Sequence, residues 1–292
     1  MTTSSLRVGL CGVGTVGLAT VHILRDQSAM LAARCGQTLS ITHVGARREV
    51  PHSDYATARI SRDVMDVARD PDVDVLVELI GGTTVARDLI KLAIEQGKHV
   101  VTANKALIAE HGNELILLAE QAGVQLRFEA AVAGGIPVIK TLREAMAANA
   151  VSEVAGIING TGNFILTEMS TKGRSYEDVL AEAQALGYAE ADPTFDVDGT
   201  DAAHKLVILA SLAFGLPLDV AAPVKQGIQA ITPEDLKFAA SMGYRVKHLG
   251  IARRQGDRVE MRVHPTLIPE QKQLANVDGV LNAIMIKGDA VG

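Results

Sequence analysis

Short apolar runs alternate with longer stretches of helical periodicity along the first half of the chain. The spacing of Leu89, Leu92 and Ala93, for example, places these side chains on one face of a helix that ends at Gly97. The predicted strands are Leu6–Cys11, Ser40–Gly45, Asp72–Leu79, His99–Thr102 and Val124–Phe128, and the predicted helices are Val16–Ala33, Val85–Gln96 and Leu107–Gln121. Strands and helices that alternate at these lengths predict an α/β domain with a doubly wound parallel sheet.

The pattern changes after Gly134, where the regular alternation stops. The predicted helices there are Ile139–Ala147, Tyr176–Leu186 and Thr200–Phe214, and the predicted strands are Val151–Ile158, Val246–Ala252, Val259–Pro265 and Val280–Ile286. Gln255-Gly256-Asp257 separates two of these strands and predicts a hairpin. We therefore predict two domains: residues 1–134 with the parallel sheet, and residues 135–292 as an α+β domain with a mostly antiparallel sheet.

The composition narrows the class of protein. The 292 residues include 28 Lys and Arg against 34 Asp and Glu, a formal net charge of −6, and 3% aromatic residues with no Trp. Proteins that bind phosphate backbones or stack on bases are usually basic or rich in aromatic side chains, so we expect no nucleic-acid partner.

The sequence also indicates the cellular compartment. The apolar run Leu206–Phe214 is too short to cross a bilayer, and Met1–Ser5 lacks the basic and apolar regions of a secretory signal. Two cysteines, Cys11 and Cys35, cannot form a disulfide framework. We therefore expect a cytoplasmic protein without a membrane partner.

A glycine-rich motif links the first predicted strand to the first predicted helix. Its Gly-x-Gly-x-x-Gly spacing allows a tight turn, close approach of a pyrophosphate and close packing of helix on strand, while the helix N-terminus favours the anion. We interpret Gly12, Val13, Gly14, Thr15, Val16 and Gly17 as a loop that binds a dinucleotide. The alternative is that these glycines only permit a turn.

The residue after the second predicted strand bears on which dinucleotide binds. An acidic residue there would bind the ribose 2′-hydroxyl of NAD, whereas Arg suits the 2′-phosphate of NADP. The sequence has Arg47 and Arg48 at this place. This favours NADP and leaves NAD open, the alternative being two solvated arginines on a loop.

Two lysines and a run of acidic residues indicate a catalytic site. Lys105 follows the strand His99–Thr102, at the edge of an α/β sheet where ligands bind. Lys205 enters an almost entirely apolar helix, so its ammonium either extends to solvent or is partly desolvated. The acidic residues before it are Glu190, Asp192, Asp196, Asp198 and Asp201. Such carboxylates could hold the ammonium of a small substrate while a lysine moves a proton to or from a hydroxyl. The alternative is an acidic loop with a surface pair between Asp201 and Lys205.

Six motifs in a fixed order connect the chain to a known family. They are Gly12–Gly17, Val100–Lys105, Phe128–Pro137, Asn159–Leu166, Gly187–Pro193 and Asp201–Lys205. With these motifs the chain resembles homoserine dehydrogenases from Arg7 to its last residue. The resemblance implies a Rossmann-type first domain and an oxidoreductase that uses NAD(P) to interconvert L-homoserine and L-aspartate 4-semialdehyde, in threonine, methionine and isoleucine biosynthesis.

The resemblance also implies roles for individual residues. Lys205 corresponds to the catalytic acid/base, assisted by Asp196, and Lys105 to a lysine where nicotinamide and substrate meet. The implied substrate-binding residues are Glu190, Asp201 and Thr161, and Gly187 lies in a loop that touches the cofactor.

A monovalent cation, Na⁺ or K⁺, is implied as well. The carbonyls of Glu129, Val132, Gly134 and Ile136 correspond to its ligands in relatives, and carbonyl oxygens suit a hard cation without requiring particular side chains. The alternative is that Gly134 only helps to make a turn between domains. Because relatives dimerise through the sheet of the second domain, we also expect a homodimer.

The sequence departs from the family pattern in two places. His204 stands where relatives commonly have Arg, and relatives continue beyond Gly292 into a Gly-rich loop and a helix, many with a regulatory ACT domain. We therefore expect a shortened second domain without an ACT domain. Two other functions remain open: a truncated, non-catalytic cofactor-binding or assembly relative, and a different Rossmann oxidoreductase. Among the latter, an aspartate-semialdehyde dehydrogenase would need a nucleophilic thiol, and neither Cys11 nor Cys35 is suitably placed.

Overall fold

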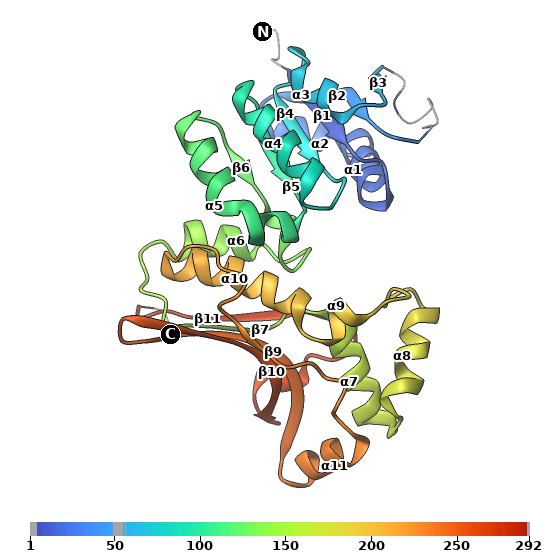
Figure 1. Ribbon diagram of the computed structural model, residues 1–292, viewed down its shortest axis with the longest axis vertical. Coiled ribbons are helices and arrows are strands. Elements are labelled where there is room, and N and C mark those ends of the chain that lie inside the picture. Colours follow the sequence, from blue (N-terminus) through green and yellow to red (C-terminus); the bar gives the residue numbers. More distant parts are fainter. Residues whose placement is uncertain (1–4, 49–54, 56, 291–292) are drawn as a thin grey trace. The chain divides into compact units, whose positions relative to one another are not determined.

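The chain divides into two compact units in the computed structural model, which describes residues 5–48, 55 and 57–290. The first unit spans Met1–Ala131 and the second spans Val132–Gly292. Each contains one sheet (Figure 1). Each also has its own set of buried side chains.

A six-stranded parallel sheet forms the centre of the first unit. Its strands are β1 (Ser5–Cys11), β2 (Thr38–Gly45), β3 (Arg59–Ser61), β4 (Val75–Glu78), β5 (His99–Thr102) and β6 (Leu126–Arg127). Their order is β3-β2-β1-β4-β5-β6, and all five neighbouring pairs are parallel. The order reverses between β1 and β4, the switch point where ligands bind in open α/β sheets. The predicted doubly wound sheet is confirmed.

Five helices accompany this sheet within the described residues. They are α1 (Thr15–Asp26), α2 (Ser28–Cys35), α3 (Val64–Arg69), α4 (Thr84–Glu95) and α5 (Lys105–Gln121). The prediction of a single helix over Val16–Ala33 is wrong, because Gln27 leaves the helical conformation at φ −105° and ψ 13°. Its N–H still donates to Ile23 and its carbonyl still accepts from Leu31, so the interruption is confined to one residue.

The second unit contains a five-stranded, mostly antiparallel sheet. Its strands are β7 (Glu153–Ile157), β8 (Val224–Lys225), β9 (Tyr244–Gln255), β10 (Arg258–Pro269) and β11 (Ala283–Lys287), in the order β11-β7-β9-β10-β8. The pairs are antiparallel apart from β8, which runs parallel to β10. The α+β prediction is therefore confirmed, as is the hairpin, which turns at Gly256 with a φ of +61°.

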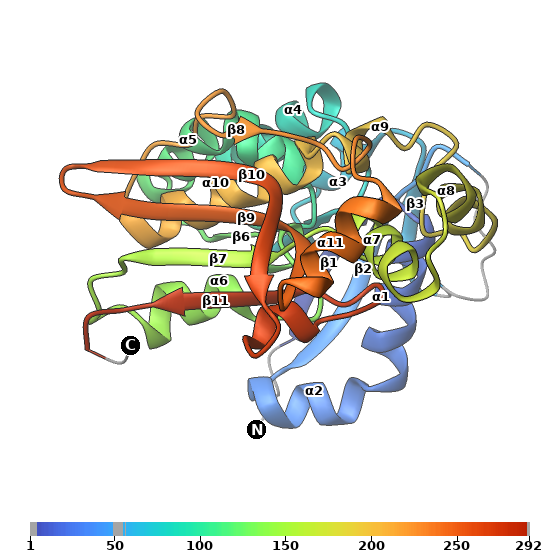
Figure 2. The same ribbon diagram turned by 90° about the horizontal axis from the view of Figure 1, so that it is seen from below.

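Helix α10 (Thr200–Phe214) packs on one face of this sheet. Gly250 of β9 has no room for a side chain, because a Cβ there would lie 2.8 Å from the side chain of Ile158. Figure 2 looks onto the opposite face, where β11, β7, β9 and β10 lie side by side in front of α10. A 3-10 turn, Gln273–Asn276, contributes Ala275 to a buried cluster with Ile157, Leu249 and Ile268.

The other helices of the second unit differ more from expectation. They are α6 (Val138–Lys140), α7 (Gly160–Lys172), α8 (Tyr176–Ala185), α9 (Thr194–Val197) and α11 (Pro233–Ser241). The helix predicted over Ile139–Ala147 is divided, because α6 passes into a π-helical turn at Thr141–Ala145. The periodicity did not predict α11, although Thr232 and Asp235 form a capping box at its start. Across the described ranges, no helix combines the length and the apolar character needed to cross a bilayer.

Candidate active site

Two glycines of the loop between β1 and α1 occupy places where a side chain cannot fit. Gly12 has a φ of +101°, and a Cβ there would lie 2.5 Å from the backbone oxygen of Leu79. A Cβ on Gly17 would lie 2.1 Å from the backbone oxygen of Gly12. The loop and the first turn of α1 therefore pack as closely as a dinucleotide-binding turn requires.

Gly14 differs from both of these glycines, because a Cβ on it would meet no atom within 4 Å. Its φ of −72° is open to any residue, so the fold itself does not require glycine here. Gly14 is the N-cap of α1, where no side chain caps the helix and the first turn holds no acidic residue. The adjoining Thr15 and Val16 are exposed, and Val13 packs against the core. Open space beside uncapped helical N–H groups fits the pyrophosphate of a dinucleotide.

Arg47 is exposed just beyond the end of β2. Arg62 donates from Nη1 to the carbonyl oxygen of Arg47 at 3.0 Å, and Arg48 is exposed as well. Several guanidinium groups thus belong to the loops at this end of β2. Guanidinium groups are the side chains that suit a 2′-phosphate.

Lys105 is the first residue of α5 and is partly buried. Asn104 caps the helix by accepting a hydrogen bond from the N–H of Leu107 at 3.2 Å. Its Nδ2 also donates to the carbonyl of Gly82, in the loop before α4, at 2.7 Å. Asn104 thus fixes where α5 begins, and with it the place of Lys105 at the carboxyl edge of the first sheet.

Lys205 lies in the first half of α10, within the second unit. Its Nζ donates to Asp201 Oδ2 and to the carbonyl oxygen of Ile158, both at 2.7 Å. The side chain of Lys205 is 15% exposed and that of Asp201 is 3% exposed. Since the pair is largely withdrawn from water, the interpretation as a solvated surface pair is wrong.

Asn159 brings a second carboxylate to this pair. Its Nδ2 donates to Asp201 Oδ2 and to Asp196 Oδ1, both at 2.9 Å. Its Oδ1 accepts from the N–H of Gly162 at 2.7 Å and so caps α7. One buried amide therefore joins Lys205, Asp201 and Asp196 into a single network.

Thr161 connects α7 to the segment that precedes α9. Its hydroxyl donates to the carbonyl oxygen of Tyr188 at 2.6 Å, and Gly187 before it has a φ of +76°. Glu190 is exposed, and its backbone carbonyl accepts from Gln184 Nε2 at 3.1 Å. The structure thus ties Thr161 to the Gly187–Glu190 segment, while the carboxylate of Glu190 faces solvent.

The segment proposed for a cation turns sharply. Ala133 has a φ of +49°, uncommon for a residue with a side chain, and Gly135 has a φ of +89°. Val132 is buried, Ile136 is partly buried and Gly134 is exposed. Carbonyl oxygens are ligands that suit a hard monovalent cation, and the carbonyl oxygen of Ile136 also accepts from the N–H of Val138 at 2.8 Å. A cluster of His, Cys, Asp or Glu suited to a metal is absent from the described residues.

The thiol chemistry of a semialdehyde dehydrogenase is not supported at Cys11. This residue is fully buried, with Sγ 3.9 Å from the carbonyl oxygen of Val64. Burial, and then the negative charge of Glu78, raise the pKa of the Cys11 thiol. A nucleophilic cysteine needs a lowered pKa, so Cys11 is unsuited to the role.

Sequence reasoning did not single out Asn159, although it stands at the start of one of the matching motifs. The available signal is its position between a strand and a glycine-rich helix start, where Asn is a preferred N-cap. Its second role, the bridge between Asp196 and Asp201, depends on residues 37 and 42 positions away. That role is visible only in the folded chain.

Comparison with known proteins assigns the chain to a family. A family model described as "Homoserine dehydrogenase, NAD binding domain" matches residues 12–129, and one described as "Homoserine dehydrogenase" matches residues 137–292. The chain belongs to the homoserine dehydrogenase family. The resemblance carried by the six motifs is thereby confirmed.

Individual homoserine dehydrogenases match over almost the whole chain. The enzyme from Pseudomonas aeruginosa is 58% identical over 98% of this chain, which spans 66% of that relative. A crystal structure from Thiobacillus denitrificans has a TM-score of 0.96 and 51% identity, covering 99% of this chain and 68% of that one. A hyperthermophilic archaeal homoserine dehydrogenase in complex with NADPH has a TM-score of 0.82 and 25% identity, covering 99% of this chain and 90% of that one. The chain thus spans about two thirds of the length of the curated relatives it matches.

Proposed function

We propose that this chain catalyses the NADP(H)-dependent interconversion of L-homoserine and L-aspartate 4-semialdehyde, a step of threonine, methionine and isoleucine biosynthesis. The observation that carries the proposal is the shielded Lys205–Asp201 pair, which Asn159 joins to Asp196. A fixed, partly buried lysine beside carboxylates is the machinery that proton transfer at a hydroxyl requires.

Lys205 is the proposed acid and base. An ammonium has three N–H donors, and Asp201 and the carbonyl of Ile158 engage two of them. The third is available to the substrate oxygen. In the direction of reduction Lys205 gives a proton to the oxygen that becomes the hydroxyl, and in the direction of oxidation it removes that proton. The nicotinamide, when bound, supplies or accepts the hydride.

Carboxylates of the second unit are proposed to hold the substrate ammonium. Glu190 is exposed and Asp201 lies next to Lys205, so together they favour a small amino acid with its hydroxyl near Nζ. Thr161 steadies the Gly187–Glu190 segment through Tyr188 and is included among the substrate-binding residues. Asp196 supports catalysis through Asn159, because both carboxylates share the same amide.

The cofactor is proposed to be NADP. The loop Gly12–Gly17 would bind the pyrophosphate, and Arg47 would bind the 2′-phosphate. Lys105 would lie at the nicotinamide end, and Gly187 would contribute to the cofactor loop. The open space above Gly14 supports this proposal, as does the archaeal relative in complex with NADPH.

A monovalent cation is proposed at the carbonyls of Glu129, Val132, Gly134 and Ile136. The positive φ values of Ala133 and Gly135 support it, because such a turn can direct successive carbonyl oxygens toward one point. Na⁺ and K⁺ are distinguished by measuring activity after dialysis and addition of each chloride salt at constant ionic strength.

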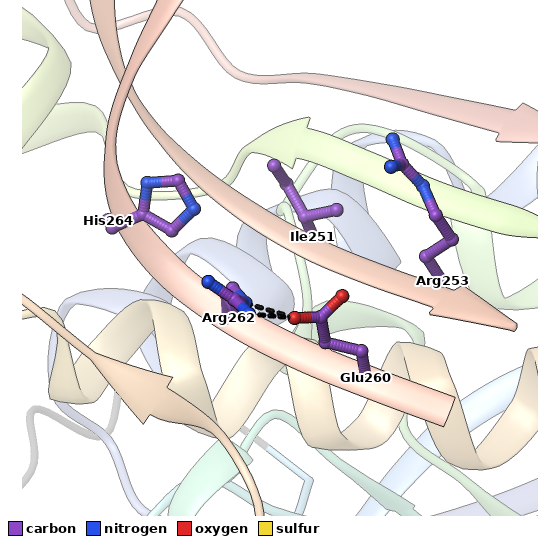
Figure 3. Close-up of a pocket in the computed structure, with 5 residues that line it drawn as sticks. All are labelled: Ile251, Arg253, Glu260, Arg262 and His264. Carbon is purple, nitrogen blue, oxygen red and sulfur yellow. Dashed lines mark hydrogen bonds and ion pairs between the residues drawn. The ribbon is translucent and has the colours of Figure 1, made fainter. Parts of the chain in front are cut away.

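A homodimer is proposed through the sheet face opposite α10. Ile251, Arg253, Glu260, Arg262 and His264 line a hollow on that face, with Arg262 paired to Glu260 (Figure 3). Arg253 pairs with Glu153 of β7 at 2.5 Å. A face that carries both signs of charge can complement its own copy across a twofold axis.

One experiment tests the activity. Titration with NADPH measures binding, and a homoserine-dependent rise in the absorbance of reduced nicotinamide measures turnover. Binding together with turnover supports the proposed enzyme. Binding without turnover would instead favour a cofactor-binding relative that lacks catalysis.

A further inference from the structure

A glutamate is completely buried at the edge of the first sheet where the cofactor is proposed to bind. Glu78 is the last residue of β4 and has no exposed surface. The strand register places it beside Cys11 of β1 and Thr102 of β5, each the last residue of its own strand. Burying a carboxylate is costly unless its oxygens accept hydrogen bonds, so its partners are informative.

Three neutral donors, two from one loop and one from the end of β5, hold the Glu78 carboxylate. Oε1 accepts from the N–H groups of Ile80 and Gly81 at 2.9 Å and 3.1 Å. Oε2 accepts from the hydroxyl of Thr102 at 2.5 Å. Ile80 and Gly81 belong to the loop between β4 and α4, whereas Thr102 begins the connection from β5 to α5. Glu78 therefore connects the loop after β4 to the start of the loop after β5, at the edge of the sheet where the cofactor is proposed to bind.

The hydrogen bonds continue from Thr102 to the start of α5. The N–H of Asn104 donates to Thr102 Oγ1 at 3.0 Å. Asn104 in turn caps the helix that begins with Lys105, and its side chain returns to the Gly82 carbonyl. The resulting ring joins Glu78, Thr102, Asn104 and Gly82, and it determines where Lys105 enters α5.

The directions of the hydrogen bonds favour a carboxylate at position 78. Because Thr102 Oγ1 accepts the N–H of Asn104, its own proton is directed to Glu78. Both oxygens of Glu78 therefore accept hydrogen bonds. Glutamine would keep one acceptor for the N–H groups of Ile80 and Gly81 but would present an NH₂ group to Thr102 Oγ1, and the Thr102 hydroxyl proton would then lose its acceptor.

The same strand end also contacts the glycine loop. The N–H of Leu79 donates to the Cys11 carbonyl at 2.8 Å, and the Leu79 carbonyl lies where a Cβ of Gly12 would have to be. A displacement of residues 78–82 would therefore reach the turn proposed to bind pyrophosphate.

We propose that Glu78 is a positioning residue of the cofactor site, which holds the loops after β4 and β5, and through Asn104 the side chain of Lys105, in the arrangement that binds the nicotinamide end of NADP(H). The proposal rests on the proposed function, because it assumes that this edge of the sheet binds the dinucleotide.

Glu78→Gln tests the proposal in the full chain. We expect the NADPH Kd, measured by the fluorescence of bound reduced nicotinamide, to rise about tenfold, in keeping with the loss of a hydrogen bond to a charged group. The KM for the cofactor should rise with it, while the KM for homoserine changes by less than about twofold, because that substrate binds carboxylates of the second unit. Asp74→Asn is the matched control: Asp74 immediately precedes the same strand and pairs with Arg7 at its opposite end, so this variant should lose stability and keep the wild-type Kd.

A second pair of variants covers the case in which Glu78→Gln does not fold. Thr102→Val removes the hydroxyl and should also weaken NADPH binding, whereas Thr102→Ser keeps it and should restore binding. Wild-type Kd in both Glu78→Gln and Thr102→Val, with only a lowered Tm, would overturn the positioning role while leaving the proposed enzyme intact. Failure of the unmodified chain to bind NADPH would overturn the proposed function and this proposal together.

Discussion

A lysine that transfers protons must be held in one place, and Lys205 is held by acceptors from two different elements. Asp201 lies one helical turn before it on α10, and Ile158 lies just beyond the end of β7. Lys205→Met removes the transferable proton but keeps the aliphatic stem, so we expect kcat to fall by about 100-fold or more. Asp201 also loses its cation, which lowers stability, so kcat is normalised to the folded fraction measured by circular dichroism. The exposed Lys237 provides the control: Lys237→Met should retain kcat, and near-normal turnover in Lys205→Met would contradict the assignment.

Asn159 has two functions that a single substitution can separate. Serine is as good an N-cap as asparagine, but its hydroxyl cannot bridge two carboxylates as the amide does. For Asn159→Ser we expect a Tm close to that of the wild type and a kcat/KM for homoserine about tenfold lower, the effect of losing one charge-assisted hydrogen bond. The measurements are thermal unfolding followed by circular dichroism and initial rates. An unchanged kcat/KM would show that the bridge is not needed.

At the residue scale, the sequence predicts contacts between residues that are near each other in the chain and does not predict contacts between distant ones. The spacing of Asp201 and Lys205 predicts their pairing, because residues four apart on a helix are neighbours. The shielding of that pair depends on how α10 packs against its own sheet, which no local pattern contains. Glu78 lies inside an apolar run that predicts a strand, but its partner Thr102 belongs to another strand. Its role follows only from the strand order.

At the scale of one element, two glycines where β1 leads into α1 should respond differently to substitution. Gly17→Ala would force a Cβ against the Gly12 carbonyl, so it should destabilise the first unit, whereas Gly14→Ala finds open space and an allowed φ. Gly14→Ala should therefore keep the wild-type Tm and raise the NADPH Kd by about tenfold or more, because its methyl group occupies the space proposed for the pyrophosphate. Thermal unfolding and NADPH titration of the two variants provide the comparison. Tight NADPH binding by Gly14→Ala would place the pyrophosphate elsewhere.

Strand β9 carries a buried histidine that links stability to pH. His248 is 5% exposed and its Nε2 lies 2.9 Å from the Gln226 carbonyl. Burial, with a smaller contribution from His264, lowers the pKa of His248, while the Gln226 carbonyl and Asp198 oppose the shift. An unfolded histidine titrates near about 6.5, so below that pH the unfolded chain binds a proton that the folded chain does not.

The free energy of unfolding should therefore fall as the pH decreases from about 6.5, by at most about 1.4 kcal/mol per pH unit for this group. His248→Gln keeps a donor for Gln226 and should flatten that slope. The carboxylates of Asp70 and Asp74, whose pKa values are also lowered, act in a separate range below about 3.9. Urea unfolding at a series of pH values measures both ranges. Identical slopes in the wild type and the variant between about pH 5 and 6.5 would refute the role of His248.

Among the elements, those with several turns or a clear alternation follow the sequence closely. Helix α10 begins and ends at the residues that its periodicity predicts, and β9 and β10 extend the predicted hairpin in both directions. The elements that the sequence predicts wrongly are short or irregular. A one-residue interruption at Gln27 and the π-helical turn at Thr141–Ala145 leave the apolar pattern unchanged, so periodicity cannot detect them. The glycine-rich start of α7 resembles a turn until its packing is known.

At the scale of the whole molecule, the regular alternation of strands and helices stops after Gly134. This change correctly predicts a parallel sheet before it and a mostly antiparallel sheet after it. The homodimer proposed for the second of them gives the last test. Met285 of β11 is 44% exposed. The strand register places Met285 on the same sheet face as Ile251, which lines the hollow described above. A dimer formed through this face would cover the Met285 side chain. Met285→Lys places a charge there without disturbing the core of one copy, so it should shift the chain toward monomer with little change in the Tm of that monomer.

The matched control is Phe238→Ser, which removes a 69% exposed aromatic side chain from α11. Multi-angle light scattering at several concentrations should show a dimer for the unmodified chain and for Phe238→Ser, and a smaller species for Met285→Lys. The argument depends on the face rather than on exposure alone, because Phe238 is the more exposed of the two apolar residues. Dissociation caused by Phe238→Ser, with Met285→Lys still dimeric, would move the interface from the sheet to α11.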